Sequence, residues 1–284
     1  METLKGKECV EALLDKMKLK LLPFEGFQPH LVIIRVGDNP SDISYEKGAM
    51  KRMEKAGIRA SNYRFDADVD PDKFMEAFRY LNNDEDVDGI LIFRPLPKHL
   101  DEKLICNTID PVKDMDCISP VNQAKLFAGD ESGYAPCTAE AVMELLKTYH
   151  IDPAGKEVAI IGRSMVIGKP LAMLMIKANA TVTVCHTKTK DIESVCRRAD
   201  IVVACAGSAK MVTPAFLKND AVVIDVGINV DKDGNLVGDV DFDAVKDVAS
   251  AASPVPGGVG MITTSVLAMH VIKAALMRRE LPEN

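Results

Sequence analysis

Short apolar runs recur along the chain at intervals that leave room for a helix between them. Each run is rich in Val, Ile or Leu and is bounded by polar residues, Gly or Pro. Such runs are typical of strands that are buried on both faces of a parallel sheet. They lie at residues 31–36, 89–93, 158–161, 181–185, 201–205 and 221–226, and a more polar strand is expected at 59–65.

Between these runs, apolar residues return every three or four positions, which is the period of a helix. Helices are expected over residues 3–20, from about 41 to 56, from Pro71, from Thr138, after Pro170, and over 263–279. Ser41, Asp42 or Ser44 is expected to cap the second of these helices. The last helix is apolar on much of its surface and should be buried, with His270 as a core histidine. Strands and helices alternate in both halves of the chain, which predicts two α/β domains.

The stretch from Glu157 to Thr189 is the most informative part of the chain. A buried strand is followed by a turn containing Gly162 and Gly168, then by a helix and a second strand. This is a βαβ unit of roughly 30 residues with glycines at its first turn. Glycine allows a close backbone approach, and the N-terminus of the helix offers free N–H groups to an anion. The spacing departs from G-x-G-x-x-G, yet it predicts a dinucleotide site.

The second strand of this unit ends in Cys185-His186-Thr187-Lys188-Thr189, which contains no acidic residue. NAD-binding units usually place Asp or Glu there, to bind the ribose 2′-hydroxyl. Arg163, Thr187 and Lys188 instead form a positive, hydroxyl-rich corner that suits a 2′-phosphate. The pattern favours NADP over NAD as the cofactor.

Composition narrows the remaining choices. The chain has 284 residues and a net charge of −7 without a basic stripe, so nucleic acid is not an expected partner. No uninterrupted apolar run of membrane length and no signal peptide is apparent, so no membrane association is expected. Seven cysteines without CxxC spacing indicate reduced thiols and a cytoplasmic location. The five histidines are far apart, and no metal site is expected.

Several motifs occur in order along most of the chain and together resemble one family. They are RVGDNP (35–40), DGIL and PLP within 88–97, PVKDMD (111–116), PCT (136–138), GRSMVIGKP (162–170), ATVTVCHTKT (180–189), DVGIN (225–229), GDVDF (238–242) and PVPGGVG (254–260). The chain resembles the methylenetetrahydrofolate dehydrogenase/cyclohydrolase family.

The resemblance implies two α/β domains with a folate cleft between them, and a homodimer. Residues 1–138 with the C-terminal helix 263–284 would form the folate-binding catalytic domain, and residues 139–262 the Rossmann domain for NADP. The implied activity oxidises 5,10-methylenetetrahydrofolate to the methenyl form. Water then opens that product to 10-formyltetrahydrofolate, within the one-carbon metabolism that serves purine biosynthesis.

The resemblance also assigns residues. Tyr45 and Asp116 are the expected catalytic residues, and Asp116 would pair with the amino and ring N–H groups of the pterin. The folate site is expected to contain Tyr45, Ala49, Phe93, Asp116, Pro256, Gly257, Gly260 and Thr263. The cofactor site is expected to contain Gly162, Arg163, Ser164, Ile167, Gly168, His186, Thr187, Lys188, Gly207, Asp225, Gly227 and Ile228.

Two positions depart from the family in the part that handles water. Ala49 stands where the family has a catalytic Lys, and Phe93 stands where it has a Gln. Hydrolysis needs an activated water, whereas hydride transfer mainly needs the two rings to be well placed. We therefore expect a dehydrogenase whose cyclohydrolase activity is weak or lost.

Two alternatives remain open. The first is a fully bifunctional enzyme in which another cation, such as Arg52, replaces the missing Lys. The second is a folate- and nucleotide-binding protein without turnover. Cys117, where the family has Gly, is a smaller departure within the expected folate site.

Overall fold

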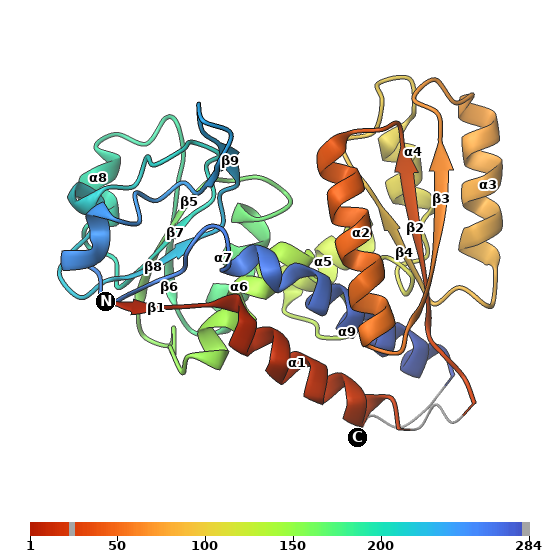
Figure 1. Cartoon of the computed structure of the whole chain (residues 1–284), viewed down its shortest axis with the longest axis horizontal. Helices are drawn as coiled ribbons and strands as arrows, with labels where there is room; N and C mark the ends of the chain where they lie inside the picture. The colour runs from red at the N-terminus through yellow and green to blue at the C-terminus, as the bar shows by residue number, and fades with distance from the viewer. Residues whose placement is uncertain (23–25, 280–284) are drawn as a thin grey trace. The chain divides into compact units, whose positions relative to one another are not determined.

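The computed structural model describes residues 1–22 and 26–279, which divide into two compact units. Unit 1 comprises Met1–Ala12 and Pro136–Thr263, and unit 2 comprises Leu13–Ala135 and the segment from Thr264 onward. Each unit has its own parallel sheet with helices beside it (Figure 1), so the predicted fold class of two α/β domains is confirmed. The unit boundaries fall inside helix α1 (Gly6–Lys20) and at the start of helix α9 (Thr263–Arg278).

The sheet of unit 2 contains three parallel strands in the order β3-β2-β4. The central strand β2 (His30–Val36) is buried at every position except its last, and β4 (Gly89–Ile92) is buried throughout. The outer strand β3 (Arg59–Phe65) is polar and mostly half-exposed. Both β3 and β4 are edge strands, but β4 is covered further, because Ile90 bridges to Asp114 and Gly89 lies against Met115 and against Val271 of α9.

Helices cover both faces of this sheet. Alternate residues of β2 and β4, such as Val32 and Ile90, pack with Phe74 and Phe78 of α3 (Pro71–Asn83). The short helices α4 (Glu102–Thr108) and α5 (Pro120–Ala128) follow β4 in the chain. The opposite face of β2 carries Arg35, whose Nε donates to Glu46 of α2 at 2.9 Å.

Helix α2 (Pro40–Lys55) carries Tyr45 and Ala49 of the expected folate site. Its N-cap is Asn39, whose side chain accepts a hydrogen bond from the N–H of Ser41 at 2.9 Å. The expectation of a cap at Ser41, Asp42 or Ser44 was wrong. Pro40 has no N–H and a preset φ, so the helix starts there and the preceding Asn becomes the cap.

Helix α9 packs tightly on β4 within unit 2. A Cβ added to Gly89 would lie 2.6 Å from Sδ of Met115 and 3.3 Å from Val271, so only glycine permits this approach. His270 is buried and its Nδ1 lies 2.9 Å from the carbonyl oxygen of Met115, as expected of a core histidine. Over the described residues, the stretch Val259–Arg278 has the length and hydropathy of a membrane span, but 72% of its most apolar 18-residue window is buried. The expectation that no stretch of this kind occurs needs that correction.

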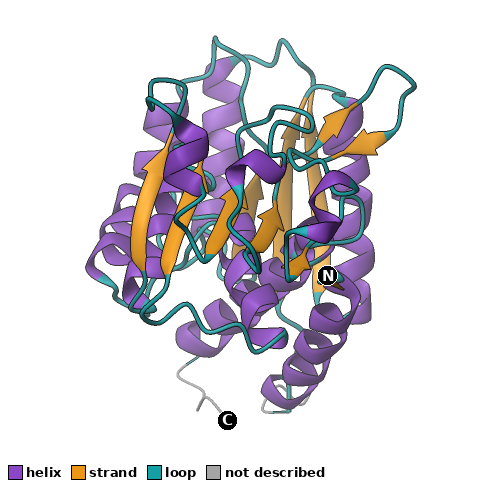
Figure 2. Cartoon of the chain, turned by 90° about the vertical axis from the view of Figure 1, so that its left-hand side faces the viewer, coloured by secondary structure: helices purple, strands orange, loops and turns teal. Residues whose placement is uncertain are grey.

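The sheet of unit 1 contains six parallel strands in the order β1-β11-β8-β7-β5-β6, with the strands in orange in Figure 2. The strands are β1 (Glu2–Thr3), β5 (Glu157–Ile161), β6 (Thr181–Cys185), β7 (Ile201–Ala204), β8 (Val222–Asp225) and β11 (Ala251–Ala252). The helices are α6 (Cys137–Thr148), α7 (Gly168–Lys177) and α8 (Ile192–Cys196). A two-stranded antiparallel hairpin, β9 (Asn229–Val230) and β10 (Leu236–Val237), follows β8.

The first residues of the chain belong to unit 1, whereas the sequence predicted them in the folate domain. The N–H of Glu2 donates to Ser250 at 2.7 Å and that of Leu4 donates to Ala252 at 2.9 Å. These bonds add β1 to the edge of the six-stranded sheet. A two-residue strand carries too little periodicity to be recognised from sequence.

Candidate active site

The first candidate region lies at the carboxyl ends of β5 and β7. The chain passes from β5 to β6 on one side, and then crosses to β7 on the other side of β5. Ligands of doubly wound sheets bind in the crevice at such a switch point. Gly162 follows β5 with φ of 137°, and a Cβ there would lie 2.4 Å from the carbonyl oxygen of Cys205. Only glycine allows the two strand ends to come this close.

The turn after β5 presents free backbone donors. Among the described residues, none accepts a hydrogen bond from the N–H of Arg163, Ser164, Met165 or Val166, and all four residues are at least half-exposed. The Oγ of Ser164 accepts from the N–H of Ile167 at 3.1 Å, which shapes the turn. Helix α7 starts at Gly168 with no side-chain cap, so its N-terminus is open to an anion.

The loop after β6 lies beside this turn, because the N–H of Gly162 donates to the carbonyl of Cys185 at 2.9 Å. The Nδ1 of His186 accepts from the N–H of Lys188 at 3.1 Å, so His186 shapes the loop. Thr187 and Lys188 are exposed. Within the described part of the chain, neither Arg163 nor Lys188 has an acidic partner within ion-pair distance, although each stands at the end of one of two paired strands.

Two buried carboxylates hold the loops after β7 and β8. Asp239 is fully buried and accepts hydrogen bonds from the N–H groups of Ala206 (2.6 Å), Gly207 (2.9 Å) and Ser208 (2.8 Å) and from Nδ2 of Asn229 (2.9 Å). The sequence indicated Asp239 only as part of GDVDF, without a role. Nothing in a single sequence identifies which backbone groups a carboxylate will bind.

Asp225 was expected to bind the cofactor, but its carboxylate faces the protein. It accepts from the N–H groups of Gly227 (3.0 Å), Asp239 (3.0 Å) and Val240 (2.9 Å) and is only 3% exposed. Burial raises the pKa of Asp225 to about 6, despite these three donors. The N–H groups of Gly207 and Gly227 are therefore occupied, while the neighbouring Ile228 is 68% exposed.

In unit 2, the structure brings Tyr45 and Phe93 together. Their ring centroids are 5.6 Å apart and their planes meet at 72°, an edge-to-face contact. Ala49, one turn after Tyr45 on α2, is completely buried. Arg94 turns to the other side, and its Nη1 lies 3.3 Å from Glu102 of α4. Position 93 thus faces α2 with an apolar ring.

Asp116 lies on a loop that a neighbouring carboxylate organises. Asp114 is buried and accepts hydrogen bonds from the N–H groups of Ile118 (2.9 Å) and Ser119 (2.8 Å). Asp116 itself is half-buried. Cys117 adopts a left-handed φ of 56°, the conformation that glycine takes most easily.

The other expected folate residues belong to unit 1. Gly257 has φ of 105°, and its carbonyl accepts from the N–H of Gly6 at 2.8 Å. The hydroxyl of Thr263 is 3.3 Å from the carbonyl of Gly260, so it is engaged within its own loop. Pro256 follows a cis peptide bond, and no described contact gives it a further role.

One basic residue near Ala49 has no partner for its buried nitrogen. Arg52 is half-buried, and its Nε is buried without a hydrogen-bond acceptor among the described residues. Burial lowers its pKa. At seven residues from Tyr45 it shares that residue's face of α2, whereas Lys47 and Lys51 are exposed on another face.

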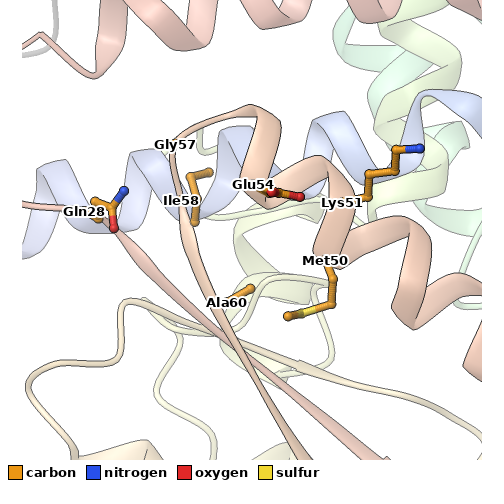
Figure 3. A pocket seen from close by; sticks show the side chains of 7 residues that line it. All are labelled: Gln28, Met50, Lys51, Glu54, Gly57, Ile58 and Ala60. Atoms are coloured by element: carbon orange, nitrogen blue, oxygen red, sulfur yellow. The ribbon is translucent and has the colours of Figure 1, made fainter.

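A pocket of about 550 Å³ lies beside α2 (Figure 3). Its walls come from α2, from the chain just before β2, and from the segment that enters β3. They are Gln28, Met50, Lys51, Glu54, Gly57, Ile58 and Ala60. It contains none of the expected folate-site residues, so we do not assign substrate to it.

Comparison with known proteins gives a consistent picture. The family profile "Tetrahydrofolate dehydrogenase/cyclohydrolase, catalytic domain" matches residues 4–116, and the profile for its NAD(P)-binding domain matches residues 136–279. The "Bifunctional protein FolD" of Clostridioides difficile is 48% identical over 98% of this chain and 97% of its own. The protein of the same name from Alkaliphilus metalliredigens is 49% identical over 99% of both chains.

Solved structures agree with these sequence matches. The bifunctional dehydrogenase/cyclohydrolase of Campylobacter jejuni has a TM-score of 0.94 at 39% identity, covering 98% of this chain and 99% of its own. The Trypanosoma brucei enzyme, described as complexed with NADP cofactor and inhibitor, has a TM-score of 0.86 at 34% identity, covering 95% and 94%. These relatives are named as bifunctional or as dehydrogenase-cyclohydrolase, so the comparisons favour the bifunctional alternative over the expected loss of hydrolysis. The chain belongs to the tetrahydrofolate dehydrogenase/cyclohydrolase family.

Proposed function

We propose that this chain is an NADP-dependent 5,10-methylenetetrahydrofolate dehydrogenase. The observation that carries the cofactor choice is the corner formed by Arg163 and Lys188. Two cations stand at the ends of adjacent strands without acidic partners among the described residues, and residues 186–190 after β6 contain no acid. A 2′-phosphate supplies the missing negative charge, whereas a 2′-hydroxyl would leave both cations uncompensated.

The residues of unit 1 fit the rest of such a cofactor. The free N–H groups of residues 163–166 and the open start of α7 suit the pyrophosphate. Glycine at 168 lets the start of α7 pack against the end of β5, since a Cβ there would lie 2.1 Å from the carbonyl oxygen of Gly162. When bound, NADP accepts a hydride from the bridging methylene of the substrate.

Each unit supplies residues that we propose for the folate. Asp116 offers a carboxylate acceptor to the donor groups of the pterin, on a loop that Asp114 keeps in shape. Tyr45 and Phe93 present aromatic surface next to each other. Pro256, Gly257 and Gly260 of unit 1 are proposed to contact the same substrate. The chain's own contribution to hydride transfer is the positioning of the folate relative to the cofactor.

We further propose that the chain also hydrolyses the methenyl product, as the names of its relatives suggest for those proteins. Ala49 supplies no base, so the water would be oriented by another group. Arg52 is suited to this, because its buried Nε lacks an acceptor among the described residues and it shares a helical face with Tyr45. An arginine stays protonated, so it would orient water and stabilise charge instead of removing a proton.

The second candidate is a dehydrogenase with weak or no hydrolysis. The edge-to-face contact of Phe93 with Tyr45 favours it, because an apolar ring faces α2 where the family has an amide. A separate hydrolase would then complete the reaction sequence in the same cell.

Methenyltetrahydrofolate hydrolysis separates the two candidates. The purified protein is given this substrate, and loss of its absorbance is compared with the spontaneous rate. The first candidate predicts enzymic turnover that Arg52→Met abolishes and that Lys51→Met, an exposed neighbour, leaves intact. The second predicts a rate at or only slightly above the spontaneous one, which neither substitution changes.

We also propose a homodimer in the cytoplasm. Within the described part of unit 2, β3 has a strand partner on one side only, and Tyr63 on this strand is 38% exposed. An unprotected edge strand is a ready surface for pairing with a second copy.

A further inference from the structure

The carboxylate of Asp239 is the most heavily used acceptor at the carboxyl ends of the strands in unit 1. Four donors converge on it, three of them consecutive backbone N–H groups of the loop after β7. The fourth is the amide of Asn229, at the start of the hairpin after β8. One fully buried side chain therefore ties the loop after β7 to the start of the hairpin after β8.

Asp225 and Asp239 each pack against a glycine that lies beside the other aspartate in the sequence. A Cβ on Gly227, two residues after Asp225, would lie 2.2 Å from Cγ of Asp239. A Cβ on Gly238 would lie 1.8 Å from Oδ2 of Asp225. Each aspartate thus occupies the space that a side chain next to the other would need. We call this pair of buried aspartates the carboxylate clamp.

The clamp determines what the two loops can offer a ligand. It occupies the N–H groups of Ala206, Gly207 and Gly227, whereas no described residue donates to their carbonyl oxygens. These loops therefore present acceptors, in contrast to the donor-rich turn after β5. A phosphate would be repelled here, and a group with N–H or O–H donors would be bound.

We propose that Asp239, supported by Asp225, is a positioning residue for the nicotinamide half of the dinucleotide. If the pyrophosphate lies at the turn after β5 and the adenosine at the end of β6, the second half crosses the switch point toward the loops after β7 and β8. A carboxamide and ribose hydroxyls are donors of the kind these carbonyls accept. This inference rests on the proposed cofactor function.

The first test compares Asp239→Asn with Asp231→Asn. Asp231 also accepts backbone N–H groups, from Asp233 at 2.9 Å and Asn235 at 2.8 Å, but it lies at the tip of the exposed hairpin. An amide at position 239 has one acceptor oxygen where the carboxylate has two, so it could not accept from all four donors. We expect Asp239→Asn to weaken NADP binding on the order of 10- to 100-fold by calorimetry, with KM for the folate unchanged. Asp231→Asn should leave both unchanged.

The second test needs no variant and no ligand. In the wild-type protein without cofactor, the amides of residues 206–208 should exchange hydrogen slowly, whereas those of residues 164–166 should exchange fast. Equal exchange in the two loops would overturn the clamp even if Asp239→Asn failed to fold. Unchanged NADP affinity in Asp239→Asn, or an equal loss of NADP and folate affinity, would overturn its positioning role. Failure of the wild type to bind NADP would instead refute the proposed function, while the exchange result would still stand.

Discussion

The rings of Tyr45 and Phe93 meet edge to face, with centroids 5.6 Å apart, at the start of α2 and the end of β4. This contact involves one of the two positions at which the chain differs from its family, because the family has a glutamine at position 93. A glutamine at position 93 would offer an amide to water or to the Tyr45 hydroxyl. The phenylalanine offers only apolar surface, and Ala49, a turn further along α2, adds no charge.

Restoring the family residues should therefore change the hydrolytic step selectively. Ala49→Lys combined with Phe93→Gln should raise methenyltetrahydrofolate hydrolysis by roughly 100-fold, the lower end of general acid–base effects. Dehydrogenase turnover should change little, because hydride transfer depends on ring placement. Arg94→Gln is the control, since Arg94 faces α4 instead of α2. A double variant as slow as the wild type would show that these two positions do not limit hydrolysis.

The positive charges of Arg163 and Lys188 predict that removing either one weakens the preference of the enzyme for NADP over NAD. Arg163→Gln and Lys188→Gln should each raise KM for NADP by about 10-fold while leaving KM for NAD nearly unchanged, because each removes one cation from the 2′-phosphate. Lys156→Gln, at the amino end of β5, should affect neither value. Steady-state kinetics with both cofactors would measure this. A parallel rise in both KM values would contradict a 2′-phosphate site.

The raised pKa of Asp225 predicts that the stability of the fold depends on pH. Burial raises its pKa to about 6, against about 3.9 for an unfolded aspartate. The folded state therefore favours the protonated form. Protonation of Asp225 contributes fully to the free energy of unfolding below a pH of about 4. This contribution, up to about 3 kcal/mol, is lost as the pH rises through about 6.

Urea unfolding of the wild type and Asp225→Asn at several pH values would reveal this contribution. The free energy of unfolding of the wild type should fall relative to that of the variant between about pH 4 and pH 7. A difference that stays constant with pH would contradict the raised pKa.

The proposed dimer can be tested through β3. Tyr63→Glu places a charge on the exposed edge strand and should yield monomers in light scattering after size exclusion. Tyr80→Glu on α3 is a matched control, since Tyr80 is 68% exposed and lies on another element. A wild type that is already monomeric, or a Tyr63→Glu variant that remains dimeric, would count against this interface.

The sequence predicted the strands and helices in which buried positions follow a regular pattern. The apolar runs at 158–161, 201–205 and 221–226 correspond to β5, β7 and β8, and the expected strand at 59–65 has the same bounds as β3. The last expected helix, 263–279, is one residue longer than α9. These elements pack as layers, so a repeating pattern of apolar residues encodes them.

The features that the sequence did not predict depend on contacts between residues that are far apart in the chain. The strand β1 exists because it pairs with β11, near the other end of the chain. The role of Asp239 depends on N–H groups of residues 206–208, and that of Asp225 on Asp239 and Val240. A carboxylate in a GDVDF motif looks the same whether it binds a ligand or holds a loop. The glycines beside the two aspartates were the available signal, since Gly227 and Gly238 leave space for them.

The absorbance of the reduced nicotinamide tests the proposed activity most directly. Purified protein is mixed with 5,10-methylenetetrahydrofolate and either NADP or NAD. We predict a rise in absorbance that depends on the protein and on the folate, and that is much faster with NADP than with NAD. A folded protein that gives no rise with either cofactor would contradict the assignment as a dehydrogenase, and a faster rise with NAD would contradict the role of Arg163 and Lys188.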